Sequence, residues 1–162
     1  MSRRSWTRGP VIASAVVGGL MGSLVDRSLI ATPAWEQLGV QAWADYSRHA
    51  DLGNGLIVYP IAFIGWTVLA VAAAVSFRFD RAAPRTAAVP VYLAALFMLI
   101  VMATTVKAAP IMLGVAHLGE DTSALRRAFE DFTFWGVYVR GAALTLAFLA
   151  AIWAASYLPA PR

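Results

Sequence analysis

The chain has 162 residues, of which 60% are hydrophobic and 14% are charged, and its formal net charge is +4. A soluble domain needs a wide polar surface and carries about 25% charged residues, so this composition indicates a protein that is partly solvated by lipid. The absence of cysteine excludes disulfides, thiolate metal sites, iron–sulfur clusters and covalent attachment of c-type haem.

Four apolar stretches are long enough to cross about 30 Å of hydrocarbon as helices. We expect an all-α, integral membrane four-helix bundle that forms one transmembrane domain over residues 1–162. The expected spans are approximately residues 11–30, 55–77, 88–106 and 135–158. The first stretch is longer than a signal-peptide core and no clean cleavage site follows it, so we interpret it as a helix of the mature protein.

The distribution of charge orients these spans. Arginines precede the first span and occupy the short second connection, whereas most of the carboxylates lie in the first and third connections. The positive-inside rule therefore places both termini in the cytoplasm and the chain, as a multi-pass protein, in the inner (cytoplasmic) membrane. Basic residues scattered at the ends of segments do not fit nucleic-acid binding.

The first connection contains an apolar periodicity. Its members recur at spacings of three and four residues, which predicts an amphipathic helix between the first and second spans. They are Trp35, Leu38, Ala42, Trp43 and Tyr46. Such a helix forms either an aromatic belt at the headgroup level or a cap over an outward-facing cavity.

The third connection, residues 107–121, precedes a second amphipathic helix. Asp121 or Thr122 can cap its N-terminus. Its apolar face is predicted to continue directly into the fourth span, and comprises Leu125, Ala128, Phe129 and Phe132.

Small residues follow one face of the first span. Ser14, Gly18 and Gly22 recur every four residues, a spacing that lets two helices approach closely. This face serves either packing within the bundle or an interface between subunits.

Polar side chains gather at the outer ends of the spans. With the orientation above, all four helices place such groups at the same depth, where a membrane makes them costly. They are Asp26, Arg27, His49, Asp51, Asn54, Tyr59, Thr104, Thr105, Lys107, Tyr138 and Arg140. They mark either a ligand or active site near the outer face or a structural network in which Asp26 pairs with Arg27 or Arg140.

Two of these residues have specific candidate roles. His49 can act as a general base or as the axial ligand of a haem, and with His117 and a carboxylate it would form a metal site. Arg140 is charged at every relevant pH and needs Asp26, Asp51 or a substrate oxygen as its partner. Pro60 is predicted to bend the second span at this level.

The second half of the chain resembles the anthrone-oxygenase-like membrane family, a group of four-helix proteins. The resemblance lies in helices three and four. It rests on Thr105 before residues 110–113 (Pro-Ile-Met-Leu), then Phe129 and Phe132, then Trp135 and Arg140 at the start of the last helix. It implies oxidation of an aromatic substrate by dioxygen.

Residues 48–56 (Arg-His-Ala-Asp-Leu-Gly-Asn-Gly-Leu) resemble the start of helix two in styrene oxide isomerase, another small four-helix membrane protein. That resemblance implies haem b bound through His49 and an epoxide substrate contacted by Asn54. The histidine and asparagine are one residue closer here than in the isomerase, and only Tyr59 or Tyr92 is available for its helix-three tyrosine.

Together these patterns favour a membrane enzyme that acts on a small hydrophobic, aromatic substrate. Its candidate catalytic residues are Asp51, Asn54, Tyr59, Lys107 and Arg140, with His49 as the haem ligand if haem b is bound. A haem is large for a 162-residue bundle and would lie between subunits, so we expect a homo-oligomer, a trimer on the isomerase resemblance. The alternative is a non-catalytic protein such as a small transporter, an assembly factor or a subunit of a complex.

Overall fold

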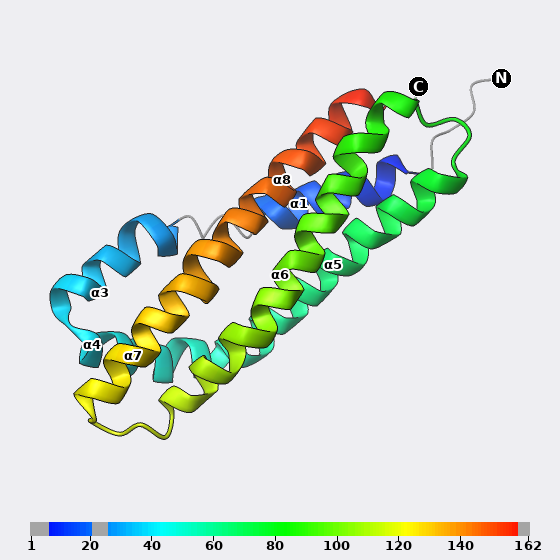
Figure 1. The fold of residues 1–162 in the computed structure, drawn as a ribbon. Coiled ribbons are helices and arrows are strands. Elements are labelled where there is room, and N and C mark those ends of the chain that lie inside the picture. The colour runs from blue at the N-terminus through cyan, green and yellow to red at the C-terminus, as the bar shows by residue number, and fades with distance from the viewer. Residues whose placement is uncertain (1–6, 21–25, 159–162) are drawn as a thin grey trace. The chain divides into compact units, whose positions relative to one another are not determined.

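The computed structural model describes residues 7–20 and 26–158, and these residues form helices and turns without a β-strand. The segments labelled η1, η2 and η4 are π-helical and η3 is a 3-10 turn. In chain order the elements are α1 (Arg8–Leu20), η1 (Arg27–Ala31), α3 (Thr32–Leu38), α4 (Val40–His49), η2 (Ala50–Asn54), α5 (Gly55–Phe79), η3 (Arg85–Ala87), α6 (Ala88–Val115), α7 (Thr122–Phe132), η4 (Thr133–Val139) and α8 (Arg140–Tyr157) (Figure 1).

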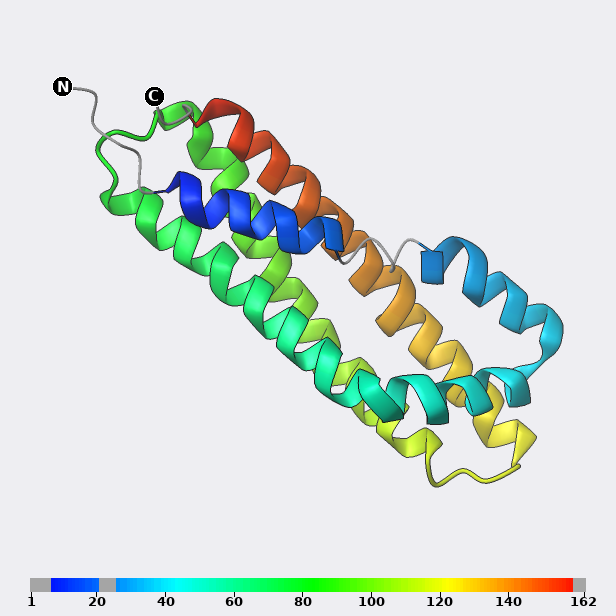
Figure 2. The same cartoon turned by 180° about the vertical axis from the view of Figure 1, so that it is seen from behind.

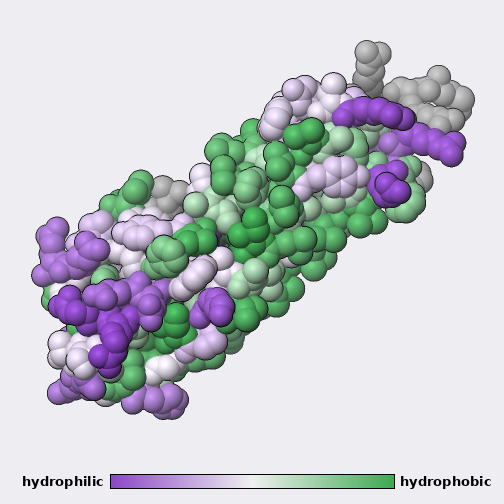
Figure 3. All heavy atoms as spheres, viewed as in Figure 1, coloured by the Kyte–Doolittle hydropathy of each residue, from purple (hydrophilic) through white to green (hydrophobic). Residues whose placement is uncertain are grey.

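Three continuous helical stretches in the described residues are long and apolar enough to cross a membrane: Val40–Phe79, Arg85–Val115 and Thr122–Tyr157. On the face that Figure 3 shows, hydrophobic side chains cover much of the long helices. The expected all-α, multi-pass membrane character is therefore confirmed at this level. The first expected span includes residues 21–25, which lie outside the described residues, so the fourth span, the four-helix bundle and the placement of the termini stay predictions.

The chain divides into two compact units. Unit 1 comprises residues 1–21, 62–101 and 143–162, and unit 2 comprises residues 22–61 and 102–142. The helices α5, α6 and α8 contribute residues to both units.

In unit 1, the small-residue face of α1 packs against Trp66 of α5. The indole Nε1 of Trp66 donates a hydrogen bond of 2.8 Å to the hydroxyl of Ser14. A Cβ at Gly18 would lie 2.6 Å from Cζ2 of Trp66 and 2.8 Å from Cδ2 of Phe148. Ser14 and Gly18 thus serve packing within the chain, and Gly22 lies outside the described residues.

In unit 2, the predicted amphipathic helix is divided in two. Gly39 adopts φ +96° between α3 and α4, a conformation that favours glycine, and the chain turns there (Figures 1 and 2). Trp35 and Trp43 are buried, but Leu38 and Tyr46 are exposed. The prediction of a single helix was wrong because regular spacing does not reveal a change of direction at a glycine.

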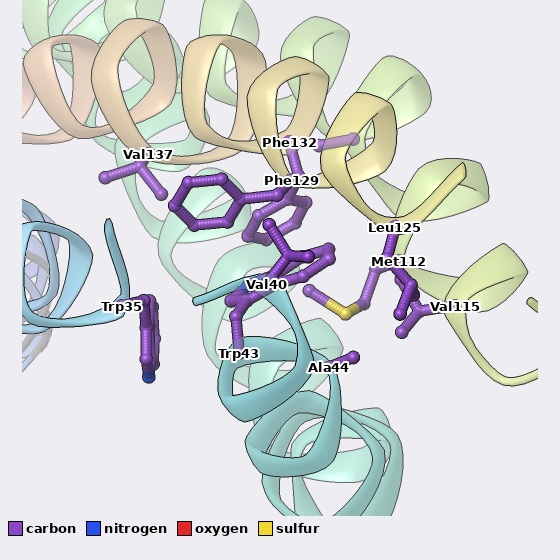
Figure 4. Packing of buried hydrophobic residues seen from close by; sticks show 11 residues of the cluster. Trp35, Val40, Trp43, Ala44, Met112, Val115, Leu125, Phe129, Phe132 and Val137 are labelled. Carbon is purple, nitrogen blue, oxygen red and sulfur yellow. The ribbon is translucent and has the colours of Figure 1, made fainter. Parts of the chain in front are cut away.

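The core of unit 2 is built from α3, α4, α6, α7 and η4. Figure 4 shows side chains from α4, α6 and α7 meeting in one cluster, with Trp43 beside the two phenylalanines of α7. The ring centroid of Trp43 lies 5.3 Å from that of Phe129 and 6.2 Å from that of Phe132. The cluster consists of Trp35, Val40, Trp43, Ala44, Ala108, Met112, Val115, Leu125, Phe129, Phe132 and Val137.

The start of α7 confirms the predicted cap. A side-chain oxygen of Asp121 accepts hydrogen bonds from the backbone N–H of Ser123 (2.9 Å) and Ala124 (3.0 Å). These donors hold the pKa of the Asp121 carboxyl below its usual value. The predicted apolar face of α7 is buried at Leu125, Phe129 and Phe132, and the helix continues through η4 into α8 as expected.

Helix α6 extends further than the sequence predicts. It continues past Val106 and through Pro110 to Val115, over residues assigned above to a connection. The reason is burial, because Ala108, Met112 and Val115 belong to the core of unit 2. Helix α5 includes Pro60, and the backbone departs from helical angles at Gly53 of η2 (φ −85°, ψ −118°).

Candidate functional site

An ion pair between Arg27 of η1 and Asp51 of η2 is the central feature of unit 2. Nη1 of Arg27 donates to Oδ1 of Asp51 at 2.8 Å, and Nη2 donates to Oδ2, so the contact is bidentate. Arg27 is 9% exposed and Asp51 is 5% exposed. Nη1 also lies 3.4 Å from the hydroxyl of Tyr59, which accepts a hydrogen bond from it. Charged groups buried to this extent are stable only when paired and hydrogen-bonded in this way.

Aromatic rings enclose the Arg27 guanidinium. Its Cζ lies 5.4 Å from the ring centroid of Trp35 and 5.5 Å from that of Phe132, within the range of cation–π attraction. Arg140 contacts the Phe132 ring as well, with its Cζ 5.7 Å from the centroid. Two guanidinium groups therefore lie against a single phenylalanine ring, and one of them is paired with the carboxylate of Asp51.

Arg140 is itself buried, at 8% exposure. Its Nε donates a hydrogen bond of 2.9 Å to the carbonyl oxygen of Gly136, one turn earlier in the same helical stretch. This bond fixes the stem of the side chain beside the ring of Phe132.

Each charged residue of the cluster lies in or beside a π-helical segment. Arg27 begins η1, Asp51 lies in η2, and Arg140 follows η4 directly. Isolated π-turns are rare and occur often at functional sites, because the wider turn shifts the register of the following side chains. In η1 the wide turn is supported by Thr32, whose backbone N–H and hydroxyl (2.9 Å) both donate to the carbonyl oxygen of Arg27.

Two glycines make room for the aromatic rings of the cluster. A Cβ at Gly55 would lie 2.9 Å from Cε2 of Tyr59 and 2.8 Å from the carbonyl oxygen of Ala50. A Cβ at Gly136 would lie 2.8 Å from Cε2 of Phe132. In both cases the ring lies over a glycine four residues away. The sequence contains this spacing, but nothing in it marks these two rings as part of a site.

The structure brings together three of the residues proposed from the sequence. Asp51, Tyr59 and Arg140 belong to the cluster described above. Asn54 and Lys107 are exposed and take no part in its described ion pair, hydrogen bonds or ring contacts.

The sequence did not identify the central residue. In the sequence Arg27 is only one of the polar groups near the outer end of the first span, and the structural alternative pairs Asp26 with it or with Arg140. Asp26 is exposed and the partner of Arg27 is Asp51, so that pairing with Arg27 was wrong. Trp35 and Phe132 were assigned to apolar faces, and nothing in their spacing pointed to a guanidinium.

His49 lies at the end of α4 and is exposed. Its Nδ1 lies 2.8 Å from the carbonyl oxygen of Asp45, so a proton on Nδ1 would be donated there and leave the Nε2 lone pair available. This arrangement suits a ligand to a metal or haem iron. However, the described residues contain no group of three or more His, Asp or Glu side chains placed to hold a metal ion, and Asp51 is engaged by Arg27.

Comparisons of the chain with protein-family models, with curated proteins and with solved structures give no match. The two resemblances set out above therefore stay expectations.

Proposed function

We propose that this chain is a multi-pass membrane enzyme that acts on a small hydrophobic, aromatic substrate at the cluster around Arg27 and Asp51. The observation that supports the proposal most is the buried ion pair, whose guanidinium lies beside the rings of Trp35 and Phe132. The two paired residues and Arg140 each lie in or directly after a π-helical segment. Ionisable groups in a membrane protein are expensive to bury and usually mark a functional site.

The chemistry of the cluster suits a reaction that develops negative charge on an oxygen atom. Guanidinium groups fixed in a water-poor environment stabilise such a charge, because the low dielectric strengthens their attraction. Arg140 would supply this stabilisation, and Asp51 or the hydroxyl of Tyr59 would move a proton. Oxidation of an aromatic substrate by dioxygen, as in anthrone-oxygenase-like proteins, belongs to this class of reaction.

The site is proposed to lie near the outer face of the inner membrane, with both termini in the cytoplasm. This orientation rests on the excess of arginine before the first span and in the short connection at residues 78–85. A substrate with an apolar body would then enter from the bilayer.

A haem-dependent epoxide isomerase is the second candidate, favoured by the geometry of His49. With Nδ1 directed at its own helix, Nε2 would hold the haem iron at the surface of α4, between subunits of a homo-oligomer such as a trimer. When bound, haem b would supply a Lewis-acidic iron, and Asn54, exposed in η2 close to His49 along the chain, would contact the substrate. The spectrum of the protein in mild detergent tests this: a Soret band should disappear in His49→Ala and persist in His117→Ala, a control at another exposed histidine.

A non-catalytic role is the competing account, and the same cluster gives it support. A bidentate pair enclosed by two rings could serve only to hold the π-helical segments of unit 2 together. Such a protein would tolerate changes that preserve the fold without any loss of chemistry.

The experiment is a turnover screen. Protein reconstituted in liposomes is incubated with a panel of phenols, anthrones and aryl epoxides in the presence of dioxygen, and products are identified by mass spectrometry. We expect a product with wild-type protein and a fall of at least about 100-fold with Tyr59→Phe, which removes one hydroxyl. Lys107→Gln, at an exposed position outside the described contacts of the cluster, tests whether that residue also takes part. Turnover that is unaffected by Tyr59→Phe and by Asp51→Asn would overturn the proposal.

A further inference from the structure

The charged residues of unit 1 gather at one end of that unit. Its described part contains four arginines and one aspartate, and no lysine, histidine or glutamate. The start of α1 is hydrogen-bonded to the segment that connects α5 with α6, and Leu158 after α8 packs with Ala87 of η3. The charged residues are Arg8 at the start of α1, Arg78 in the last turn of α5, and Asp80, Arg81 and Arg85 in the connection.

The aspartate serves the fold of this end. Oδ2 of Asp80 accepts hydrogen bonds from the backbone N–H (3.1 Å) and the hydroxyl (3.2 Å) of Thr7. Oδ1 accepts a hydrogen bond of 2.9 Å from the backbone N–H of Ala82. These bonds join α1 to the connection and hold the turn after α5, so the carboxylate is surrounded by neutral donors of the chain itself.

The arginines, in contrast, present unused donors. Arg78, Arg81 and Arg85 are exposed, and within the described part of the chain none of them forms a hydrogen bond or an ion pair. Nη1 of Arg8 is buried and likewise has no hydrogen-bond partner among the described residues. This end of unit 1 therefore offers a positive surface to a ligand with anionic oxygen atoms.

Exposed aromatic side chains lie at the same end. Phe79, between two of the arginines in the sequence, is 71% exposed. Tyr92 near the start of α6 and Trp153 and Tyr157 near the end of α8 are also exposed, and the rings of Trp153 and Tyr157 lie 6.3 Å apart. Tryptophan and tyrosine gather where membrane helices meet the lipid headgroups, so these residues indicate the level of the membrane surface.

We propose that this end of unit 1 binds the headgroup of an anionic phospholipid. The guanidinium groups of Arg78, Arg81 and Arg85 donate to the phosphate oxygens, and the ring of Phe79 contacts the apolar part of the lipid next to its headgroup. A lipid fits better than a free anion because an exposed phenylalanine accompanies the cations, and because the helices on both sides of the connection are apolar enough to cross a bilayer. The proposal is independent of the function proposed above, whose residues belong to unit 2.

The test compares two lipids that differ in the charge of the headgroup. Phosphatidylglycerol and phosphatidylcholine with identical acyl chains are titrated into the full-length protein in a nonionic detergent, and bound lipid is counted by native mass spectrometry. Wild-type protein should bind phosphatidylglycerol at least about 10-fold more tightly. Equal affinity for the two lipids would overturn the proposal, and this comparison needs no variant to fold.

Variants then locate the binding. The double variant Arg81→Gln/Arg85→Gln should reduce the preference for phosphatidylglycerol at least about 5-fold. Arg126→Gln/Arg127→Gln, which removes two exposed arginines from α7, is the matched control and should leave the preference unchanged. A full preference in the folded Arg81→Gln/Arg85→Gln protein, or an equal loss in the control, would place the binding elsewhere and contradict the proposal.

Two further measurements distinguish a lipid from a free anion. Phe79→Ala should weaken the binding of both lipids and preserve their ratio, because it removes apolar contact and no charge. Inorganic phosphate at millimolar concentration should not displace phosphatidylglycerol. Displacement by phosphate, together with lipid binding that is unaffected by Phe79→Ala, would identify a site for free phosphate and overturn the assignment to a phospholipid.

Discussion

The ring of Phe132 occupies the space that a side chain at Gly136 would fill. A Cβ there would lie 2.8 Å from Cε2 of Phe132 and 3.0 Å from Cζ. Because that ring also contacts Arg27 and Arg140, the glycine fixes the position of the surface on which both guanidinium groups lie.

Gly136→Ala should therefore disturb the cluster. The ring is only 4% exposed and packed within the core of unit 2, so it cannot move aside freely. We expect a loss of about 1–3 kcal/mol in the free energy of unfolding, the usual cost of overpacking, measured by equilibrium unfolding in mixed micelles.

The control for this variant is Gly114→Ala in α6. A Cβ at Gly114 meets nothing within 4 Å, so alanine should be neutral or stabilise the helix by up to about 1 kcal/mol. Equal effects of the two substitutions would mean that the ring of Phe132 does not lie over Gly136.

Two adjacent glycines of α1 allow a similar test in unit 1. A Cβ at Gly18 would lie 2.6 Å from Cζ2 of Trp66, whereas a Cβ at Gly19 would only reach Cε2 of Phe148 at 3.8 Å, an ordinary contact. Gly18→Ala should destabilise by about 1–3 kcal/mol and shift the fluorescence of Trp66, while Gly19→Ala should do neither. If Gly19→Ala were the more harmful of the two, α1 would present a different face to α5.

The cap of α7 predicts a dependence on pH. Because backbone and hydroxyl donors hold the pKa of Asp121 below the ordinary value of 3.8, the carboxylate stabilises the helix above that pH. This stabilisation is lost as the pH falls from 3.8 through the lower pKa of the folded state.

An NMR titration of the Asp121 carboxyl measures this directly, with an expected midpoint below 3.8. Asp121→Asn keeps an acceptor oxygen without the titration, so amide exchange in the first turn of its α7 should depend less on acid than in the wild-type protein. A midpoint at or above the ordinary value would show that the carboxyl does not cap the helix.

Local signals made some of this structure predictable. Asp121 could be identified as a cap because capping depends on the few residues that follow it. The start of α5 at Gly55 and the buried face of α7 followed from composition and from spacing within one helix. The arrival of Asp51, Tyr59 and Arg140 in one cluster followed from the expectation that polar groups in spans face the interior.

The pairing of Arg27 with Asp51 could not be predicted, because it depends on relationships between segments. The π-turns of η1 and η2 determine the direction of these side chains, and the spacing of residues in a sequence does not predict a π-turn. The turn at Gly39 could not be predicted for a similar reason. The apolar periodicity continues in the sequence across this glycine, although the chain turns there.

The proposed site depends on the ion pair between Arg27 and Asp51, and a double-mutant cycle tests that pair most directly. Unfolding free energies are measured for Arg27→Met, Asp51→Leu and the double variant, with Arg48 and Asp45, an exposed pair at 3.1 Å, as the control cycle. Each single change should cost about 3–5 kcal/mol, because it leaves a buried charge without a partner, and the double variant should recover much of that loss. The control pair should show a coupling of at most about 1 kcal/mol. Effects of Arg27→Met and Asp51→Leu that add to within about 0.5 kcal/mol would show that the two side chains are not paired, and would contradict the site proposed here.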